Sequence, residues 1–392
     1  MRKLQAIGLV AGTILLMAPR LAAQTVCPGY SIVINTPEDE LTLAYNGAEN
    51  PQDQVAAVDK FVAAHADSKF LPCALEYYTM AYLKLNNFAK VIENGEKAIA
   101  LGHRDMMTSL NVAKAYVSAG KVSDAGFDTI LGAAEVIKTE SVPSRSTSVS
   151  DEDWKKEVDA ATSQASDWRA YMEYAFFQLV QREPDAAKRL PWLDKFAAAY
   201  PDTPNTSQLQ FQYFLVYKMT NQPDKAIEAG EKAVSADPNN LAAANLLAYD
   251  MAFVRKNVDR AEQLARKALE LAAALKKPES QTDEQFKADQ NNQLGMARLT
   301  MGYASYAKAS AANNKKIGPA IEDLKAAADL LPGNPTLQAQ ALYLLGSAYE
   351  YQYPPTHKLA IDALTRGVAI PGPFQPASQK LLADVKKAAG VK

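Results

Sequence analysis

The chain has 392 residues, of which 48% are hydrophobic and 22% are charged, and its formal net charge at pH 7 is −2. This composition allows a large packed core or a long solenoid. Because the charges are mixed and nearly balanced, the surface offers no electrostatic reason to bind nucleic acid or anionic lipid. We therefore expect no nucleic-acid partner.

Residues 1–23 have the pattern of a secretory signal peptide. Arg2 and Lys3 precede an apolar run of about 15 residues, which is short for a membrane span. Ala23 provides a small residue at the expected cleavage position. We expect an exported chain, periplasmic or secreted, with no transmembrane segment after cleavage; an uncleaved anchor is the alternative.

Two cysteines, Cys27 and Cys73, follow the signal. In an oxidising compartment such a pair is a candidate disulfide, which would tie the N-terminal tail to the first helix pair. Two unpaired buried thiols are the alternative.

Residues 24–138 contain N-terminal helices followed by helix pairs. Thr36-Pro37 is typical of an N-cap followed by proline in the first helical turn, and it opens a short helix that we expect to end at Tyr45. A second helix is expected over Gln52–His65. Residues 139–153 are rich in Ser and Thr and predict a loop.

The remainder divides by composition into three segments. Residues 154–277 begin with an aromatic helical block and continue into helix pairs. Residues 278–293 are polar and predict a loop that leads into a helix. Residues 294–392 contain further helix pairs and end in a charged helix suited to cap a solenoid.

The helix pairs repeat at a fixed spacing. Ala226, Gly230 and Ala233 recur as the small residues Ala261, Ala265 and Ala268, and Tyr82 recurs as Tyr116. Small residues at helical spacing are needed where paired helices approach closely. A period of about 34 positions indicates a repeat architecture.

This pattern resembles the tetratricopeptide repeat family, on Tyr217, Ala226, Gly230, Ala233 and Pro238 of one unit and on the corresponding small residues of the next. The resemblance covers most of residues 70–135 and 205–370. It implies an all-α superhelical solenoid of about five to seven antiparallel helix pairs. It also places four tyrosines at a buried position of the first helix of a pair: Tyr82, Tyr116, Tyr217 and Tyr349.

A longer repeat is superimposed on the short one. Asp59-Lys60-Phe61 recurs as Asp194-Lys195-Phe196, and Tyr82 recurs as Tyr217, in each case 135 positions later. We call this spacing the long offset. Exposed residues also match across it, which packing alone does not require. The long offset therefore indicates duplication of a segment of several helices.

No catalytic, cofactor-binding or metal-binding motif is visible, so we expect no enzymatic activity and no cofactor. The three histidines, His65, His103 and His357, have no second ligand at metal-site spacing, and we expect them in turns or on the surface. An enzyme whose site is assembled from distant residues is the alternative that the sequence cannot display.

The family resemblance implies a concave face that binds a protein or peptide partner. The residues it places there are mostly aromatic: Phe211, Leu215, Asn245, Tyr249, Phe253, Tyr343, Ser347 and Tyr351. Contacts with neighbouring repeats are the alternative role for these side chains. The expected function is a non-enzymatic interaction scaffold in the cell envelope. A short resemblance of KFAAAYPDT to envelope tetratricopeptide proteins makes an assembly factor for an outer-membrane or secretion complex the second candidate.

Overall fold

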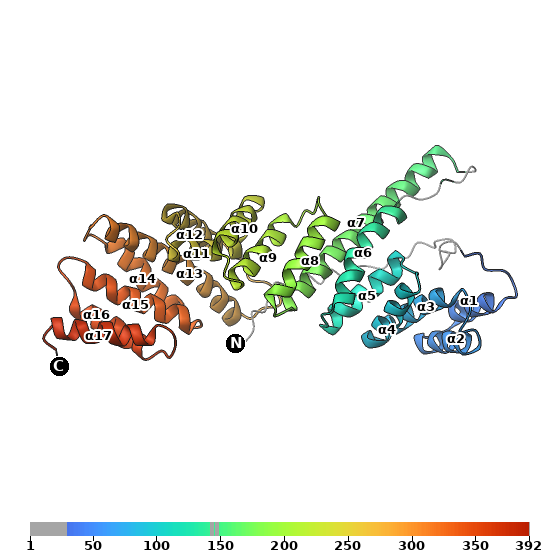
Figure 1. Cartoon of the computed structure of the whole chain (residues 1–392), viewed down its shortest axis with the longest axis horizontal. Helices are drawn as coiled ribbons and strands as arrows, with labels where there is room; N and C mark the ends of the chain where they lie inside the picture. Colours follow the sequence, from blue (N-terminus) through green and yellow to red (C-terminus); the bar gives the residue numbers. More distant parts are fainter. Residues whose placement is uncertain (1–29, 142–144, 146–148, 392) are drawn as a thin grey trace. The chain divides into compact units, whose positions relative to one another are not determined.

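A computed structural model describes residues 30–141, 145 and 149–391 (Figure 1). These residues form α-helices joined by turns and loops, with no β-strand among them. The predicted signal peptide and Cys27 lie outside the described residues. Within those residues, no helix is both long and apolar enough to cross a bilayer.

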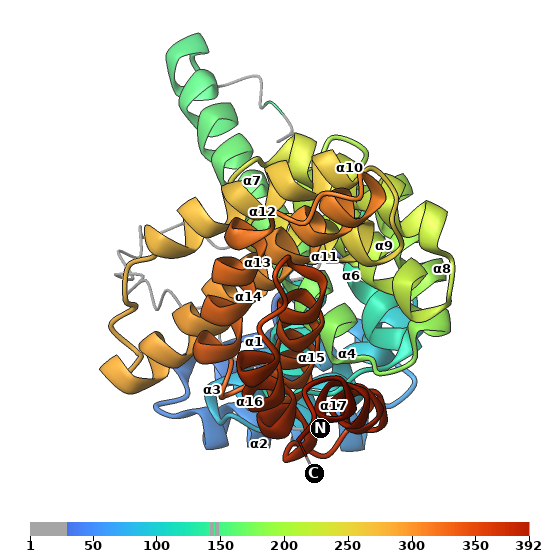
Figure 2. The ribbon, with the colours of Figure 1, turned by 90° about the vertical axis from the view of Figure 1, so that its left-hand side faces the viewer.

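The chain divides into two compact units, of which the N-terminal unit comprises residues 30–205. From α1 to α6 each helix packs against the next, and α5 also contacts α7. Figure 2 shows that one end of the long helix α7 extends beyond the other helices of this unit. The helices are α1 (Pro37–Gly47), α2 (Pro51–Ala64), α3 (Leu71–Lys84), α4 (Phe88–Ala100), α5 (Met106–Ala119), α6 (Asp124–Glu140), α7 (Asp151–Arg182) and α8 (Ala186–Ala199).

The C-terminal unit comprises residues 206–391. Every helix packs against the next, and the alternate helices α11, α13, α15 and α17 also contact one another in succession. This is the packing of stacked helix hairpins, and the expected all-α solenoid of helix pairs is confirmed. The helices are α9 (Thr206–Met219), α10 (Pro223–Ala236), α11 (Leu241–Phe253), α12 (Val258–Ala273), α13 (Asp283–Ala311), α14 (Gly318–Leu330), α15 (Pro335–Tyr351), α16 (His357–Val368) and α17 (Gln375–Ala388).

Local sequence explains where many helices begin. The Thr36 hydroxyl accepts a hydrogen bond from the Asp39 backbone N–H at the start of α1, and Asn50 caps α2 in the same way through Asp53. Each cap satisfies a backbone donor that has no partner inside the helix, and a proline follows within the first turn. The first two helices therefore form close to the predicted positions.

The predicted polar loop at residues 278–293 is shorter than expected, because α13 already begins at Asp283. Thr282 and Gln285 form a capping box, in which each side chain accepts a hydrogen bond from the other residue's backbone N–H. This reciprocal cap starts the helix in spite of the polar composition that follows.

The tyrosines at the family position are buried to different degrees. Tyr116 is 1% exposed, whereas Tyr82, Tyr217 and Tyr349 are partly exposed. The expectation of a buried position is therefore met fully only at Tyr116.

The duplication is visible in the helix boundaries. Both ends of α2 and α8 are separated by the long offset, and so are both ends of α3 and α9. The turns that follow also agree, since Asn86 and Asn221 adopt positive φ angles of 55° and 56°. Asparagine tolerates this left-handed conformation better than most residues. The two segments therefore share backbone conformation as well as residue identities.

Side-chain packing follows the same offset. The missing side chain of Gly95 in α4 leaves room for Thr79 and Val112, and that of Gly230 in α10 leaves room for Phe214 and Leu247. The long offset relates Thr79 to Phe214 and Val112 to Leu247. A glycine at this position lets the second helix of one hairpin approach the first helix of the next.

Candidate functional site

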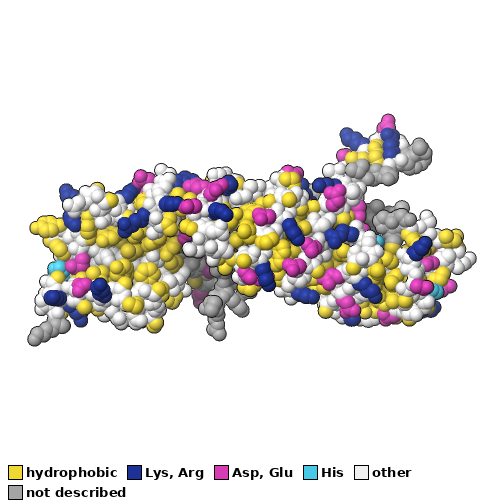
Figure 3. Space-filling view, in the orientation of Figure 1, with side chains coloured by type: hydrophobic (Ala, Val, Ile, Leu, Met, Phe, Trp, Pro, Cys, Tyr) yellow, Lys and Arg dark blue, Asp and Glu magenta, His cyan; other side chains and the backbone are white. Residues whose placement is uncertain are grey.

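The residues predicted to form a binding face lie on α9, α11 and α15, three of the four first helices of the pairs between α9 and α16. Six of the eight are partly exposed non-polar or aromatic side chains: Phe211, Leu215, Tyr249, Phe253, Tyr343 and Tyr351. Figure 3 shows hydrophobic side chains gathered over the region of α11, α13 and α15. We call the surface formed by α9, α11, α13 and α15 the first-helix face.

Aromatic rings on this face contact one another across helices. The Phe253 ring lies 4.4 Å from that of Tyr249 and is stacked on that of Tyr303, with 4.2 Å between centroids. The Tyr249 hydroxyl donates a hydrogen bond of 2.8 Å to Gln340 Oε1. Helices α11, α13 and α15 are thus joined by a cluster that was not predicted in this form, since Tyr303 and Gln340 were absent from the expected set.

Two predicted polar residues are engaged internally. Asn245 is 1% exposed, and its Nδ2 donates hydrogen bonds to the backbone oxygen and the side-chain oxygen of Gln293, at 3.1 and 2.8 Å. The Ser347 hydroxyl donates to the Tyr343 backbone oxygen at 3.0 Å. Asn245 therefore holds α11 to α13, while Ser347 satisfies its own helix.

Exposed cations border the aromatic rings, which the sequence interpretation missed. Lys218 Nζ lies 5.6 Å from the Tyr249 ring centroid and Lys315 Nζ lies 3.5 Å from that of Tyr351. Arg255 Nε donates a hydrogen bond of 3.3 Å to the Tyr303 hydroxyl. A cation over an aromatic face is attracted by the ring quadrupole. Arg255 and Lys315 lie in the segments between helices, where the helical spacing used to predict the face does not apply.

A different cluster lies in the N-terminal unit. His103, in the turn before α5, has its Nε2 atom 2.7 Å from Glu76 Oε2 and 3.2 Å from Asp105 Oδ2. Glu76 comes from α3 and Asp105 is the N-cap of α5. His103 lies between helices, as expected, and helix packing brings it together with a glutamate that no metal-site spacing links to it.

Burial and hydrogen bonding set the charges in this cluster. Burial raises the pKa of Glu76 to about 8. For His103 burial acts in the opposite direction, but the hydrogen bonds to Asp105 and Glu76 outweigh it and raise the pKa to about 9. Burial also opposes ionisation of Asp105, yet its hydrogen bonds with His103 and Glu76 lower its pKa. At neutral pH, an imidazolium between an ionised Asp105 and a neutral Glu76 leaves the cluster electrically balanced.

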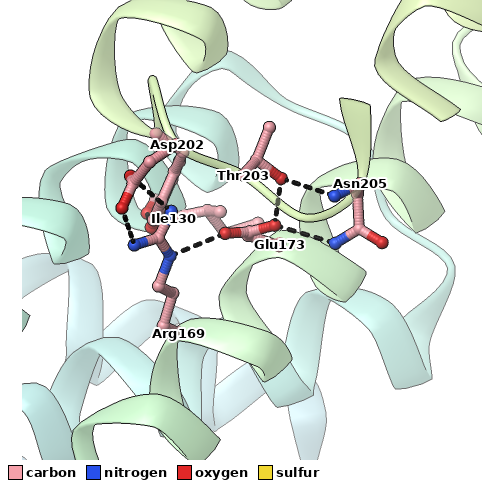
Figure 4. Close-up of polar contacts among 7 residues, drawn as sticks. Ile130, Arg169, Glu173, Asp202, Thr203 and Asn205 are labelled. Atoms are coloured by element: carbon pink, nitrogen blue, oxygen red, sulfur yellow. Dashed lines mark hydrogen bonds and ion pairs between the residues drawn. The ribbon is translucent and has the colours of Figure 1, made fainter. Parts of the chain in front are cut away.

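A third set of contacts centres on Glu173 of α7, a carboxylate that is 1% exposed (Figure 4). Its Oε1 accepts from Arg169 Nε at 2.8 Å, and its Oε2 accepts from the Thr203 hydroxyl at 2.5 Å and from Asn205 Nδ2 at 2.8 Å. Arg169 also holds Asp202 through two further hydrogen bonds. Three side chains donate to Glu173, and one of them, Arg169, also holds Asp202, so this network fixes the turn after α8 to α7.

The Glu173 network has a counterpart across the long offset. The Ser68 hydroxyl donates to Glu38 Oε1 at 2.9 Å, as Thr203 does to Glu173. The backbone N–H of Phe70 donates to that hydroxyl, as that of Asn205 does to Thr203. A contact shared by both copies serves the hairpin itself, so we read it as structural.

The other two histidines have different surroundings from those of His103. His357, at the start of α16, has its Nδ1 atom 2.9 Å from Glu350 Oε1. The ring of His65 lies 5.3 Å from that of Phe61.

The structure places Cys73, the second predicted disulfide residue, in the buried core of the first helices at 3% exposure.

No protein-family model matches the chain, and neither does any curated protein. Solved structures with similar helical arrangements include the P58(IPK) TPR domain (14% identity, TM-score 0.26, covering 90% of this chain and 89% of that one). Others are the APC/C hetero-tetramer Cut9-Hcn1 (13%, 0.28, 90% and 91%) and yeast Tom70 (12%, 0.28, 90% and 96%). The helices and their contacts establish the fold independently of these structures.

Proposed function

We propose that the chain is a non-enzymatic scaffold that binds a partner protein or peptide on the first-helix face of its C-terminal unit. The observation that carries the proposal is the set of partly exposed aromatic rings on α11 and α15, one of them stacked on the buried Tyr303 of α13, bordered by exposed lysine and arginine side chains. Aromatic anchors in a desolvated surface supply most of the free energy of many protein interfaces. The signal-like N-terminus supports a place in the cell envelope.

The chemistry of the face indicates what the partner presents. Rings that remain partly exposed can bury apolar side chains of a bound segment. Lys218 is already paired with Asp250, so it is Arg255 and Lys315 that favour a segment that also carries carboxylates. A peptide with apolar anchors and flanking acidic residues satisfies both features.

Replacing Tyr249 and Phe253 together by alanine should reduce partner binding by at least tenfold, because two neighbouring anchors are removed at once. The measurement is site-specific photo-crosslinking in the native envelope, with the photoreactive residue at Tyr343 on the face or at exposed Lys232 on α10. A defined adduct at position 343, absent at 232 and lost in the double variant, is the expected result.

The matched control is the double variant Tyr213→Ala, Tyr217→Ala. These two rings are also partly exposed and stacked, with 6.0 Å between centroids. They lie on α9, two positions along the helix from the predicted Phe211 and Leu215, and therefore point to the opposite side of that helix. We expect both double variants to lose the same amount of helicity. If only the Tyr249, Phe253 variant also loses the adduct, the loss reflects binding and not folding. Retention of the adduct in the Tyr249, Phe253 variant would refute the assignment of the face.

A further inference from the structure

The ligand-type atoms of Glu76, His103 and Asp105 converge on one point. One carboxylate oxygen, one imidazole nitrogen and a second carboxylate oxygen all lie within 4.8 Å of one another. The nitrogen lies 2.7 and 3.2 Å from the two oxygens. Atoms bound to a tetrahedral Zn²⁺ at about 2.0–2.2 Å are about 3.3–3.6 Å apart, so both nitrogen–oxygen separations need to lengthen by less than about 1 Å to accommodate the ion.

The surroundings of the three side chains are those of a built site. Asp105 uses its other oxygen, Oδ1, to accept a hydrogen bond of 2.7 Å from the Thr108 backbone N–H, which fixes the carboxylate. Glu140, at the end of α6, accepts from the backbone N–H of Met106 beside it. The side chains of His103 and Asp105 are 10% and 11% exposed, so the site has access to solvent, while that of Glu76 is 4% exposed.

The duplicated segment shows that the fold does not need these groups. Across the long offset, Glu76, His103 and Asp105 correspond to Phe211, Pro238 and Asn240. Asn240 still caps its helix, accepting from the Ala243 backbone N–H at 3.0 Å as Asp105 does from Thr108. The second copy builds the same hairpin junction without an ionisable triad, so packing does not explain the triad in the first copy.

We propose that Glu76, His103 and Asp105 bind one divalent transition-metal cation of the zinc type. An imidazole nitrogen with two carboxylate oxygens suits Zn²⁺ and its first-row neighbours, whereas Ca²⁺ and Mg²⁺ are bound by oxygen ligands. Binding of the ion displaces the protons of the His103 imidazolium and of Glu76, and the resulting neutral imidazole and two carboxylates match the double positive charge of the ion. Water completes the coordination.

Titration of Zn²⁺ into the untagged full chain, followed by calorimetry, tests the proposal. Wild type should bind one Zn²⁺ at the site, and Glu76→Gln and His103→Gln should each weaken that binding at least tenfold. The matched control is His357→Gln, which removes a histidine that contacts only one carboxylate residue, Glu350, among the described side chains. That variant should bind Zn²⁺ as wild type does.

X-ray absorption of the zinc-loaded wild type provides a readout that does not depend on how the variants fold. One nitrogen and at least two oxygen ligands at about 2.0–2.2 Å are expected. If wild type binds Zn²⁺ no more tightly than His103→Gln does, the proposal is overturned. So would loss of binding in His357→Gln, or a ligand set without nitrogen.

Discussion

Replacing Glu173 by glutamine should lower the free energy of unfolding of the N-terminal unit by about 2–4 kcal/mol. The reason is the number of donors that converge on this buried carboxylate. Oε1 accepts from Arg169, and Oε2 accepts from both Thr203 and Asn205. Glutamine has one oxygen and one NH₂ group, so in either orientation its NH₂ faces a donor and leaves a buried polar group without a partner.

The duplication supplies a matched control for this prediction. Glu38 occupies the equivalent position but is partly exposed, and its carboxylate accepts a hydrogen bond from the Ser68 hydroxyl. Glu38→Gln should therefore cost less than about 1 kcal/mol, because water can satisfy what the amide does not. Urea unfolding followed by circular dichroism gives the overall change. Hydrogen exchange of peptides from α7 and α8 locates it. Equal destabilisation by the two substitutions would show that burial of Glu173 does not determine the cost.

Much of the fold could be predicted from the sequence, because helix caps and small residues at fixed spacing are local signals. The cap at Thr36 and the small residues Ala226 and Gly230 indicated helices and helix pairs that the structure contains. The long offset, read from pairs such as Tyr82 and Tyr217, extends to helix boundaries and turn conformations. Residues 283–293 were misassigned because overall polarity was weighed above the capping box.

The side-chain clusters could not be predicted in the same way, because they depend on the register between helices. Glu76 and His103 are far apart in the chain and lie on different elements, so no motif spacing links them. One signal was available, however: Glu76 occupies the position that Phe211 takes in the second copy. A charged residue where the duplicate has an aromatic one marks a site whose chemistry differs between the copies.

Replacing Gly95 by alanine should destabilise the N-terminal unit by about 2 kcal/mol, although alanine is the better helix former. The added methyl group would lie far inside contact distance of Val112 Cγ2 on α5. Val112 is fully buried, and its β-branched side chain has little rotational freedom within a helix. Relief of the clash therefore requires α4 and α5 to separate, and that cost exceeds the gain in helix propensity, about 1 kcal/mol.

Thermal and urea unfolding of three further variants test this explanation. Gly230→Ala meets Leu247 Cδ1 at 2.7 Å and the Phe214 ring at 3.2 Å. Leu247 has a second rotatable bond, so the cost should be smaller than that of Gly95→Ala, about 1 kcal/mol. Gly47→Ala meets no atom within 4 Å and should not destabilise the chain. Combining Gly95→Ala with Val112→Ala should recover about 1–2 kcal/mol relative to the sum of the single changes, because the new methyl group then fills the space that valine leaves. Additive effects in that double variant would mean that the two side chains do not compete for one space.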